Sequence, residues 1–179
     1  MGLALALTGC GGGGDDAKPE AASSAASSAP SVSASPADPE AADKTAVLAA
    51  YSALSAEQMK AYRQGSAKGT KVERYASLDA LTQIRSDVDR LKESGTVVRG
   101  DVGHEPEVTD IDMDAEIPTA TLSDCVDLSK YQTYDTVAKK VIPLPPEQPL
   151  RYVMTVTAER WDNERWMVTR VTPEDGPEC

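Results

Sequence analysis

The sequence of 179 residues contains no phenylalanine, two tryptophans and a single histidine. With one histidine and three cysteines, few metal sites can be built from imidazole and thiolate ligands. Basic residues are also scarce: 18 Lys and Arg stand against 29 Asp and Glu, which gives a net charge of −11. Nucleic-acid-binding proteins need a basic surface, so this class is excluded. The sequence also lacks the run of about 18 apolar residues that an ordinary membrane-spanning helix requires.

The chain opens with an apolar segment that ends at Cys10. The residues Leu7, Thr8, Gly9 and Cys10 resemble the lipobox of bacterial lipoprotein signal peptides, in which an aliphatic residue and two small residues precede a cysteine. The resemblance implies cleavage before Cys10 and attachment of a diacylglycerol to its thiol. We therefore expect residues 1–9 to be a signal peptide, and Cys10 to anchor the protein at the extracytoplasmic face of a bacterial cell membrane.

No Lys or Arg precedes Cys10, although a signal peptide begins with a basic segment and a longer apolar one. We therefore expect the true start codon to lie upstream. A chance match in a stretch rich in Ala, Leu and Gly is the alternative. Myristoylation of Gly2 is excluded, because Ala6 occupies the position that requires Ser or Thr.

Residues 10–44 are of low complexity and consist mainly of Gly, Ala, Ser and Pro. They have almost no large apolar side chains to offset the entropy of ordering, which predicts a disordered linker. Such a linker has an r.m.s. span of about 30 Å. It carries six acids and two bases, which leaves a charge of −7 for the rest of the chain. Both parts would be repelled by anionic lipids, so the lipid on Cys10 would hold the protein at the membrane.

Two cysteines, Cys125 and Cys179, remain if Cys10 is lipidated. An even pair of cysteines in an exported domain favours a disulfide, and two free thiols are the alternative. The disulfide would close a loop of about 55 residues and stabilise the domain by up to about 4 kcal/mol.

Two helices are expected at the start of residues 45–179, the predicted folded domain. The first covers about residues 43–64 and ends at Gly65. The second begins at the N-cap Ser77 and ends at Gly95. The apolar face of the first helix is formed by Val47, Tyr51, Leu54 and Tyr62. The apolar stripe of the second, which predicts core packing, is formed by Leu78, Leu81, Ile84, Val88 and Leu91.

After the second helix, the apolar period changes to two, which is typical of strands. The long polar and Pro-rich segment 127–149 is expected to be an excursion whose arms partly pair. Helices followed by antiparallel strands predict an α+β fold, in which the two helices cover one face of a curved sheet. The predicted strands cover residues 96–99, 108–113, 116–126, 150–161 and 165–172, with a turn at Asp162-Asn163.

This order of elements looks like the nuclear-transport-factor-2-like cone fold, which ketosteroid isomerase shares. Short segments are also similar to a group of uncharacterised actinobacterial secreted proteins and lipoproteins. In that group an Asp-Cys strand and a C-terminal Cys recur, which implies that Cys125 and Cys179 pair. No activity is implied by the group, and the fold hosts many functions. The similar segments lie at 75–94, 94–100, 120–127 and in the closing hairpin from Glu159 to Thr169.

Asp124 is the one candidate for catalysis. By alternation it shares a strand face with Ala120 and Leu122. A carboxyl group facing an apolar cone would have a raised pKa and could act as a general base. The alternative is a structural role, in which Asp124 binds backbone groups near the disulfide and the 127–149 excursion. No partner acid or oxyanion donor can be named from the sequence, which favours the structural role.

The remaining polar motifs give no metal or cofactor site. His104 lies in a Gly-x-Glu-Pro segment, which predicts a surface loop, and no Gly-x-Ser-x-Gly elbow supports a Ser/His/Asp triad. The alternating acids Asp110, Asp112 and Asp114 lack the Gly and Glu of a calcium-binding EF-hand loop. An aromatic binding rim would need Tyr131, Tyr134, Trp161 and Trp166, but tryptophans in a closing hairpin are more often cross-strand pairs.

The sequence therefore predicts a lipid-anchored extracytoplasmic domain, without a cofactor, for which three functions stay open. The favoured one is a non-enzymatic domain that binds a partner protein or supports an envelope complex. The second is a domain that binds a small apolar or amphipathic molecule between sheet and helices. The third is an isomerase- or dehydratase-like enzyme with Asp124 as its base.

Overall fold

The structure is a computed structural model that describes residues 39–161, 164–175 and 179. The predicted signal peptide, Cys10 and nearly all of the predicted linker lie outside the described residues, as does the predicted turn at Asp162-Asn163. None of the described helices is long and apolar enough to cross a membrane.

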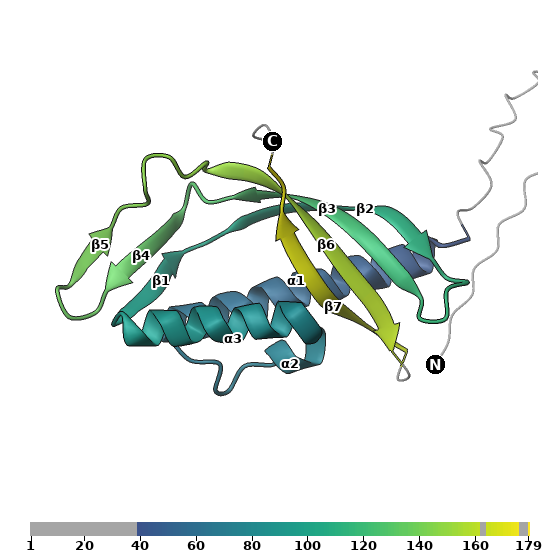
Figure 1. The fold of residues 1–179 in the computed structure, drawn as a ribbon, viewed down its shortest axis with the longest axis horizontal. Helices are drawn as coiled ribbons and strands as arrows, with labels where there is room; N and C mark the ends of the chain where they lie inside the picture. Colours follow the sequence, from purple (N-terminus) through teal and green to yellow (C-terminus); the bar gives the residue numbers. More distant parts are fainter. Residues whose placement is uncertain (1–38, 162–163, 176–178) are drawn as a thin grey trace, which may run out of the picture. The chain divides into compact units, whose positions relative to one another are not determined.

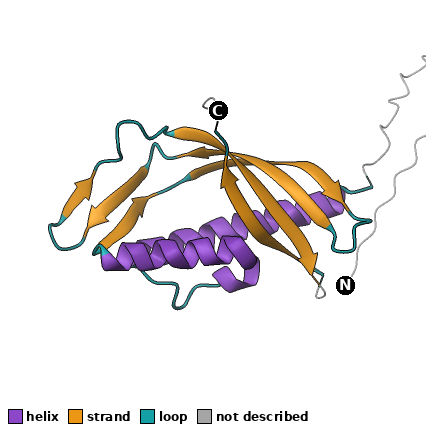
Figure 2. Cartoon of the chain, in the orientation of Figure 1, coloured by secondary structure: helices purple, strands orange, loops and turns teal. Residues whose placement is uncertain are grey.

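The described chain is α+β, as the sequence predicts. Helices come first and antiparallel strands follow, and the two long helices lie on the same side of the strands (Figures 1 and 2). The helices are α1 (Ala41–Gln64), α2 (Val72–Tyr75) and α3 (Leu78–Glu93). The strands are β1 (Thr96–Gly100), β2 (Gly103–Asp112), β3 (Thr119–Asp127), β4 (Tyr131–Asp135), β5 (Lys140–Ile142), β6 (Arg151–Trp161) and β7 (Arg165–Pro173).

The strands form two sheets, so the prediction of one curved sheet is wrong. The larger sheet has the order β2-β3-β6-β7, and the smaller one has the order β1-β4-β5. The segment 127–149 contributes β4 and β5, which pair with each other, as expected of its arms. However, β4 also pairs with β1 along its whole length, and this pairing separates the excursion from the larger sheet.

Helix α1 ends where Gly65 adopts the left-handed conformation and its N–H bonds back to the carbonyls of the last turn. Helix α3 follows Ser77, whose backbone N–H donates to the Val168 carbonyl of β7 at 3.0 Å. This bond fixes the start of α3 against the larger sheet. Leu78 does not belong to the apolar stripe, because its side chain is 58% exposed. The stripe begins instead at Ala80 and continues through Ile84 and Val88, which are buried.

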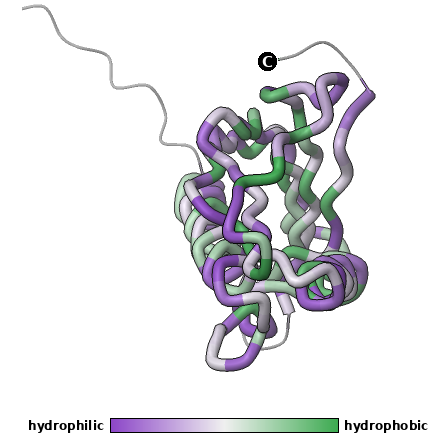
Figure 3. Tube along the Cα trace, turned by 90° about the vertical axis from the view of Figure 1, so that its left-hand side faces the viewer, coloured by the Kyte–Doolittle hydropathy of each residue, from purple (hydrophilic) through white to green (hydrophobic). Residues whose placement is uncertain are grey.

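The core lies between the larger sheet and the helices. Strand β3 alternates strictly between buried and half-buried residues, as a strand with one face on a core must. The alternation of apolar and polar residues along the chain is visible in Figure 3. The largest apolar side chains that are fully buried are those of Leu54, Leu122, Val47, Val98, Val156 and Val168.

Gly100 occupies a position at the end of β1 where no other residue fits. Its φ of 73° lies in the left-handed region, which favours glycine. A Cβ atom at this position would stand 1.8 Å from the carbonyl oxygen of Lys130. Because Gly100 has no side chain, the end of β1 can lie against the backbone of Lys130, directly before β4.

Cys125 and Cys179 form a disulfide, with Cα atoms 5.9 Å apart. Cys125 follows Asp124 on β3, and consecutive side chains of a strand point to opposite faces. The disulfide therefore lies on the face of the sheet that is turned away from the core.

Replacing both Cys125 and Cys179 by Ala should lower the free energy of unfolding by up to about 4 kcal/mol, because the disulfide restricts the unfolded chain. Urea denaturation of the oxidised wild type and the double variant measures this difference. A reductant should bring the wild type to the stability of the variant and leave the variant unchanged. Equal stability of the two oxidised proteins would contradict the prediction.

Candidate functional site

The carboxylate of Asp124 is fully buried in the larger sheet, with 0% of the residue exposed. Its Oδ2 atom accepts a hydrogen bond from the Tyr51 hydroxyl of α1 at 2.7 Å. The same oxygen lies 2.6 Å from Nδ1 of His104 on β2. Its Oδ1 atom accepts the backbone N–H of Glu105 at 2.7 Å. Three donors from two elements thus surround one buried acid, which compensates for its burial.

The pKa of Asp124 is lowered, contrary to the raised value that the catalytic alternative requires. Burial by itself would raise the pKa of this carboxyl group. The hydrogen bonds from His104 and Tyr51 act in the opposite direction and bring the pKa below its ordinary value of 3.8. Asp124 is therefore ionised at neutral pH and accepts these hydrogen bonds. It lacks the raised pKa that the catalytic alternative requires.

His104 lies on strand β2, so the prediction of a surface loop is wrong. Its side chain is 26% exposed, and its ring meets the Tyr51 ring edge-on with centroids 5.7 Å apart. Because the Asp124 carboxylate can only accept, Nδ1 of the imidazole must donate to it. The second ring nitrogen, Nε2, makes no hydrogen bond within the described parts of the chain and is free to contact a ligand.

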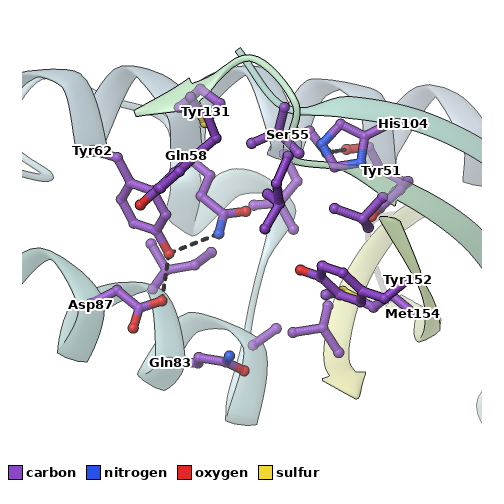
Figure 4. Close-up of a pocket in the computed structure, with 18 of the residues that line it drawn as sticks. Tyr51, Ser55, Gln58, Tyr62, Gln83, Asp87, His104, Tyr131, Tyr152 and Met154 are labelled. Atoms are coloured by element: carbon purple, nitrogen blue, oxygen red, sulfur yellow. Dashed lines mark hydrogen bonds between the residues drawn. The ribbon is translucent and has the colours of Figure 1, made fainter. Parts of the chain in front are cut away.

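His104 also lines a cavity of about 340 Å³ between the helices and the larger sheet (Figure 4). This volume lies at the lower end of the range of small-molecule sites. Asp124 is not among the lining residues, whereas its two side-chain partners, Tyr51 and His104, are. The apolar part of the wall is formed by Leu54, Met59, Ala80, Ile84, Val102, Val126, Leu128, Leu144, Met154 and Val171.

The opposite wall of the cavity carries a second hydrogen-bonded group. The Tyr62 hydroxyl donates to Oδ2 of Asp87 at 2.6 Å and accepts from the Gln58 amide at 2.8 Å (Figure 4). Burial and the neighbouring Asp87 raise the pKa of Tyr62 above its ordinary value of 10.0, so this phenol stays neutral. The cavity thus has polar groups at two ends and apolar residues between them.

The other candidates from the sequence do not converge on this site. Trp166 is buried in the core, whereas Trp161 is exposed, so they form no common rim. Tyr131 lines the cavity, but the Tyr134 ring lies under the Arg99 guanidinium, 3.2 Å from it. Among the described residues, no group of three or more His, Cys, Asp or Glu side chains is placed to hold a metal ion.

The role of His104 is not predicted from the sequence, because Gly103 and Pro106 beside it are typical of a turn. Pro106 is compatible with β2 because β2 is an edge strand. A signal was present, since positions 102, 104, 106 and 108 are half-buried and the intervening residues are exposed. Reading the period of two across the proline would have placed His104 on the inner face.

Comparisons with known proteins assign no family to the chain. No family model and no curated protein matches it. Among solved structures, the intermembrane space region of the chloroplast protein ARC6 is similar, with 13% sequence identity and a TM-score of 0.49. The similarity covers 73% of this chain and 95% of that chain.

Replacing Asp124 by Asn should lower the free energy of unfolding at neutral pH by at least about 2 kcal/mol, because charged hydrogen bonds are lost. The lowered pKa gives this contribution its pH dependence. It is fully present above about pH 4 and is lost as the pH falls through the folded-state pKa. Denaturation of both proteins from about pH 5 to pH 2 should therefore show a difference that shrinks toward acid.

Asp110→Asn is the matched control, because Asp110 is exposed on the neighbouring strand β2 and the change in charge is the same. This variant should be as stable as the wild type at neutral pH. If Asp124→Asn were equally harmless, the buried hydrogen bonds would not have the importance assigned to them.

Proposed function

We propose that this domain binds a small amphipathic molecule in the cavity between its helices and the larger sheet. The observation that carries the proposal is the cavity itself, since a core filled by side chains would have left no room for a ligand. Its volume of about 340 Å³ equals that of roughly eleven water molecules in the liquid. An apolar wall with a few polar groups is typical of small-molecule sites.

The polar groups are held in place before any ligand arrives. Asp124 orients the His104 ring, and Asp87 orients the Tyr62 ring. Because these side chains are already ordered, less entropy is lost on binding. A polar group of the ligand can reach Nε2 of His104, while its apolar body contacts the side chains between the two polar ends.

Two features of the chain support a finer assignment within this proposal. A helical layer on antiparallel strands, with a cavity between them, is compatible with a nuclear-transport-factor-2-like cone and with the actinobacterial group. The lipobox-like sequence before Cys10 supports a lipoprotein on the extracytoplasmic face of a bacterial membrane. In this proposal the lipid keeps the domain where amphipathic molecules are concentrated.

A partner-binding role is the second candidate function. It is favoured by the exposed apolar side chains on and beside the hairpin of β4 and β5. Val137 is 83% exposed, and Val141 and Ile142 of β5 are exposed as well. An envelope protein could cover this surface. An enzymatic role with Asp124 as the reacting base is not proposed, because Asp124 does not reach the cavity.

Filling the cavity should abolish ligand binding without unfolding the domain. Ser55 of α1 lines the cavity, so Ser55→Phe places a ring inside it (Figure 4). We expect the uncharged fluorophore N-phenyl-1-naphthylamine to bind the wild type with increased emission, and the variant at least about tenfold more weakly. Fluorescence titration measures both affinities, and thermal denaturation checks the fold.

Ser52→Phe is the control, because Ser52 is exposed on the same helix and does not line the cavity. This variant should bind the fluorophore like the wild type. If the wild type bound no fluorophore, or if both variants bound equally well, the cavity would not be a binding site. The exposed surface around Val137 would then be the better candidate.

The lipid anchor has a test of its own. Mass spectrometry of the protein from bacterial membranes should find a diacylglycerol thioether on Cys10 at the N-terminus of the mature chain. Cys10→Ser should carry no diacylglycerol and should keep the apolar segment before position 10, because the lipobox that directs both steps is lost. A wild-type mature chain without a diacylglycerol on Cys10 would contradict the proposed anchor.

A further inference from the structure

The described residues that line the cavity include the acidic side chain of Asp87 and neither lysine nor arginine. Asp87 contributes a carboxylate to the wall, and the ionised Asp124 lies directly behind His104. An anionic ligand would thus lose its hydration in the cavity without meeting a lysine or arginine side chain, which is unfavourable.

The cavity wall is also rich in tyrosine. Four of the six tyrosines in the sequence line it, namely Tyr51, Tyr62, Tyr131 and Tyr152. Figure 4 shows the Tyr152 hydroxyl pointing into the cavity, with Tyr62 on the opposite wall. Burial raises the pKa of Tyr51, Tyr62 and Tyr152, so these phenols are neutral. Aromatic rings and phenol oxygens both present partial negative charge, which attracts cations.

Arg90, the partner of Asp87 outside the cavity, does not cancel the attraction of the cavity for cations. Arg90 contacts the other carboxylate oxygen, Oδ1, at 2.9 Å. Its side chain is 73% exposed, so water and salt screen its charge. The Oδ2 atom of Asp87 accepts from Tyr62 on the cavity side. A cation in the cavity would lie in a less polar medium than Arg90, where the attraction of the carboxylate is stronger.

We infer that the cavity selects an amphipathic organic cation, in which an ammonium group is joined to an apolar body, over an anion of the same size. This inference rests on the proposed binding function and adds the charge of the ligand to it. Asp87 and the tyrosines contact the ammonium group, and the apolar wall contacts the body. The net charge of −11 further raises the concentration of cations near the protein.

The test compares three ligands that share an eight-carbon chain and differ in their head group. Octyltrimethylammonium, 1-octanol and octanoate displace N-phenyl-1-naphthylamine from the disulfide-bonded full chain, each below its micelle concentration. We expect the cation to displace the fluorophore at a concentration at least about tenfold lower than octanoate requires. Added salt should weaken the binding of the cation and leave that of the alcohol unchanged.

Asp87→Asn provides the second arm, because the amide oxygen can still accept from Tyr62 while the charge is removed. This variant should lose most of the preference for the cation and retain its affinity for octanol. Asp89→Asn is the matched control, since Asp89 lies on the same helix α3, is exposed and does not line the cavity. Its preference should equal that of the wild type.

The outcomes separate this inference from the proposed function. If the fluorophore binds and octanoate displaces it as well as the cation does, the inference fails and the binding function stands. The same holds if octyltrimethylammonium displaces nothing, or if Asp87→Asn leaves the preference unchanged. If the fluorophore itself does not bind, the proposed function and the inference fail together. The comparison of ligands on the wild type is valid even if Asp87→Asn does not fold.

Discussion

The buried carboxylate of Asp124 is the constraint on which the arrangement of this domain depends. A fully buried charge is tolerated only where donors surround it. Here the donors are the Tyr51 hydroxyl, the His104 ring and the Glu105 backbone N–H. A shift of α1 away from β3 would remove the Tyr51 donor, and a shift of β2 would remove the other two. The hydrogen bonds of Asp124 therefore fix the position of α1 relative to the larger sheet. They also fix the part of the cavity wall that Tyr51 and His104 form.

Helix α1 connects the two sheets through contacts spread along its length. Near its start, Asp43 pairs with Arg160 of β6 at 3.0 Å. In the middle, Tyr51 donates to Asp124 of β3. Near its end, Arg63 donates to the carbonyl of Gly100 on β1 at 2.9 Å. Helix α1 thus contacts both sheets along its length. These contacts keep the strands in place around the cavity.

The sequence predicts the local part of this structure well and the non-local part poorly. The period of two on β3 correctly places Asp124 on the inner face, and the helical period correctly buries Tyr51. Their contact spans 73 positions of the chain, and no local pattern encodes it. The pairing of β4 with β1 is likewise non-local, so the sequence predicts one sheet where the structure has two.

The errors at single residues have physical causes of the same kind. The glycine and proline beside His104 favour turns and predict a loop there, but an edge strand accepts both residues. The expected raised pKa of Asp124 follows from burial alone, and the donors that reverse it come from distant segments. Leu78 fits the apolar period of its helix and is nevertheless exposed at the first turn.

Gly100 shows that exposure and tolerance to mutation are separate properties. The residue is exposed, and a comparison based on burial alone would rank it among the freely replaceable positions. Yet any side chain there would collide with the Lys130 carbonyl, and its backbone conformation is one that other residues rarely adopt. In a saturation mutagenesis experiment, the surface of this domain would therefore contain an intolerant position whose cause is the backbone, not a binding partner.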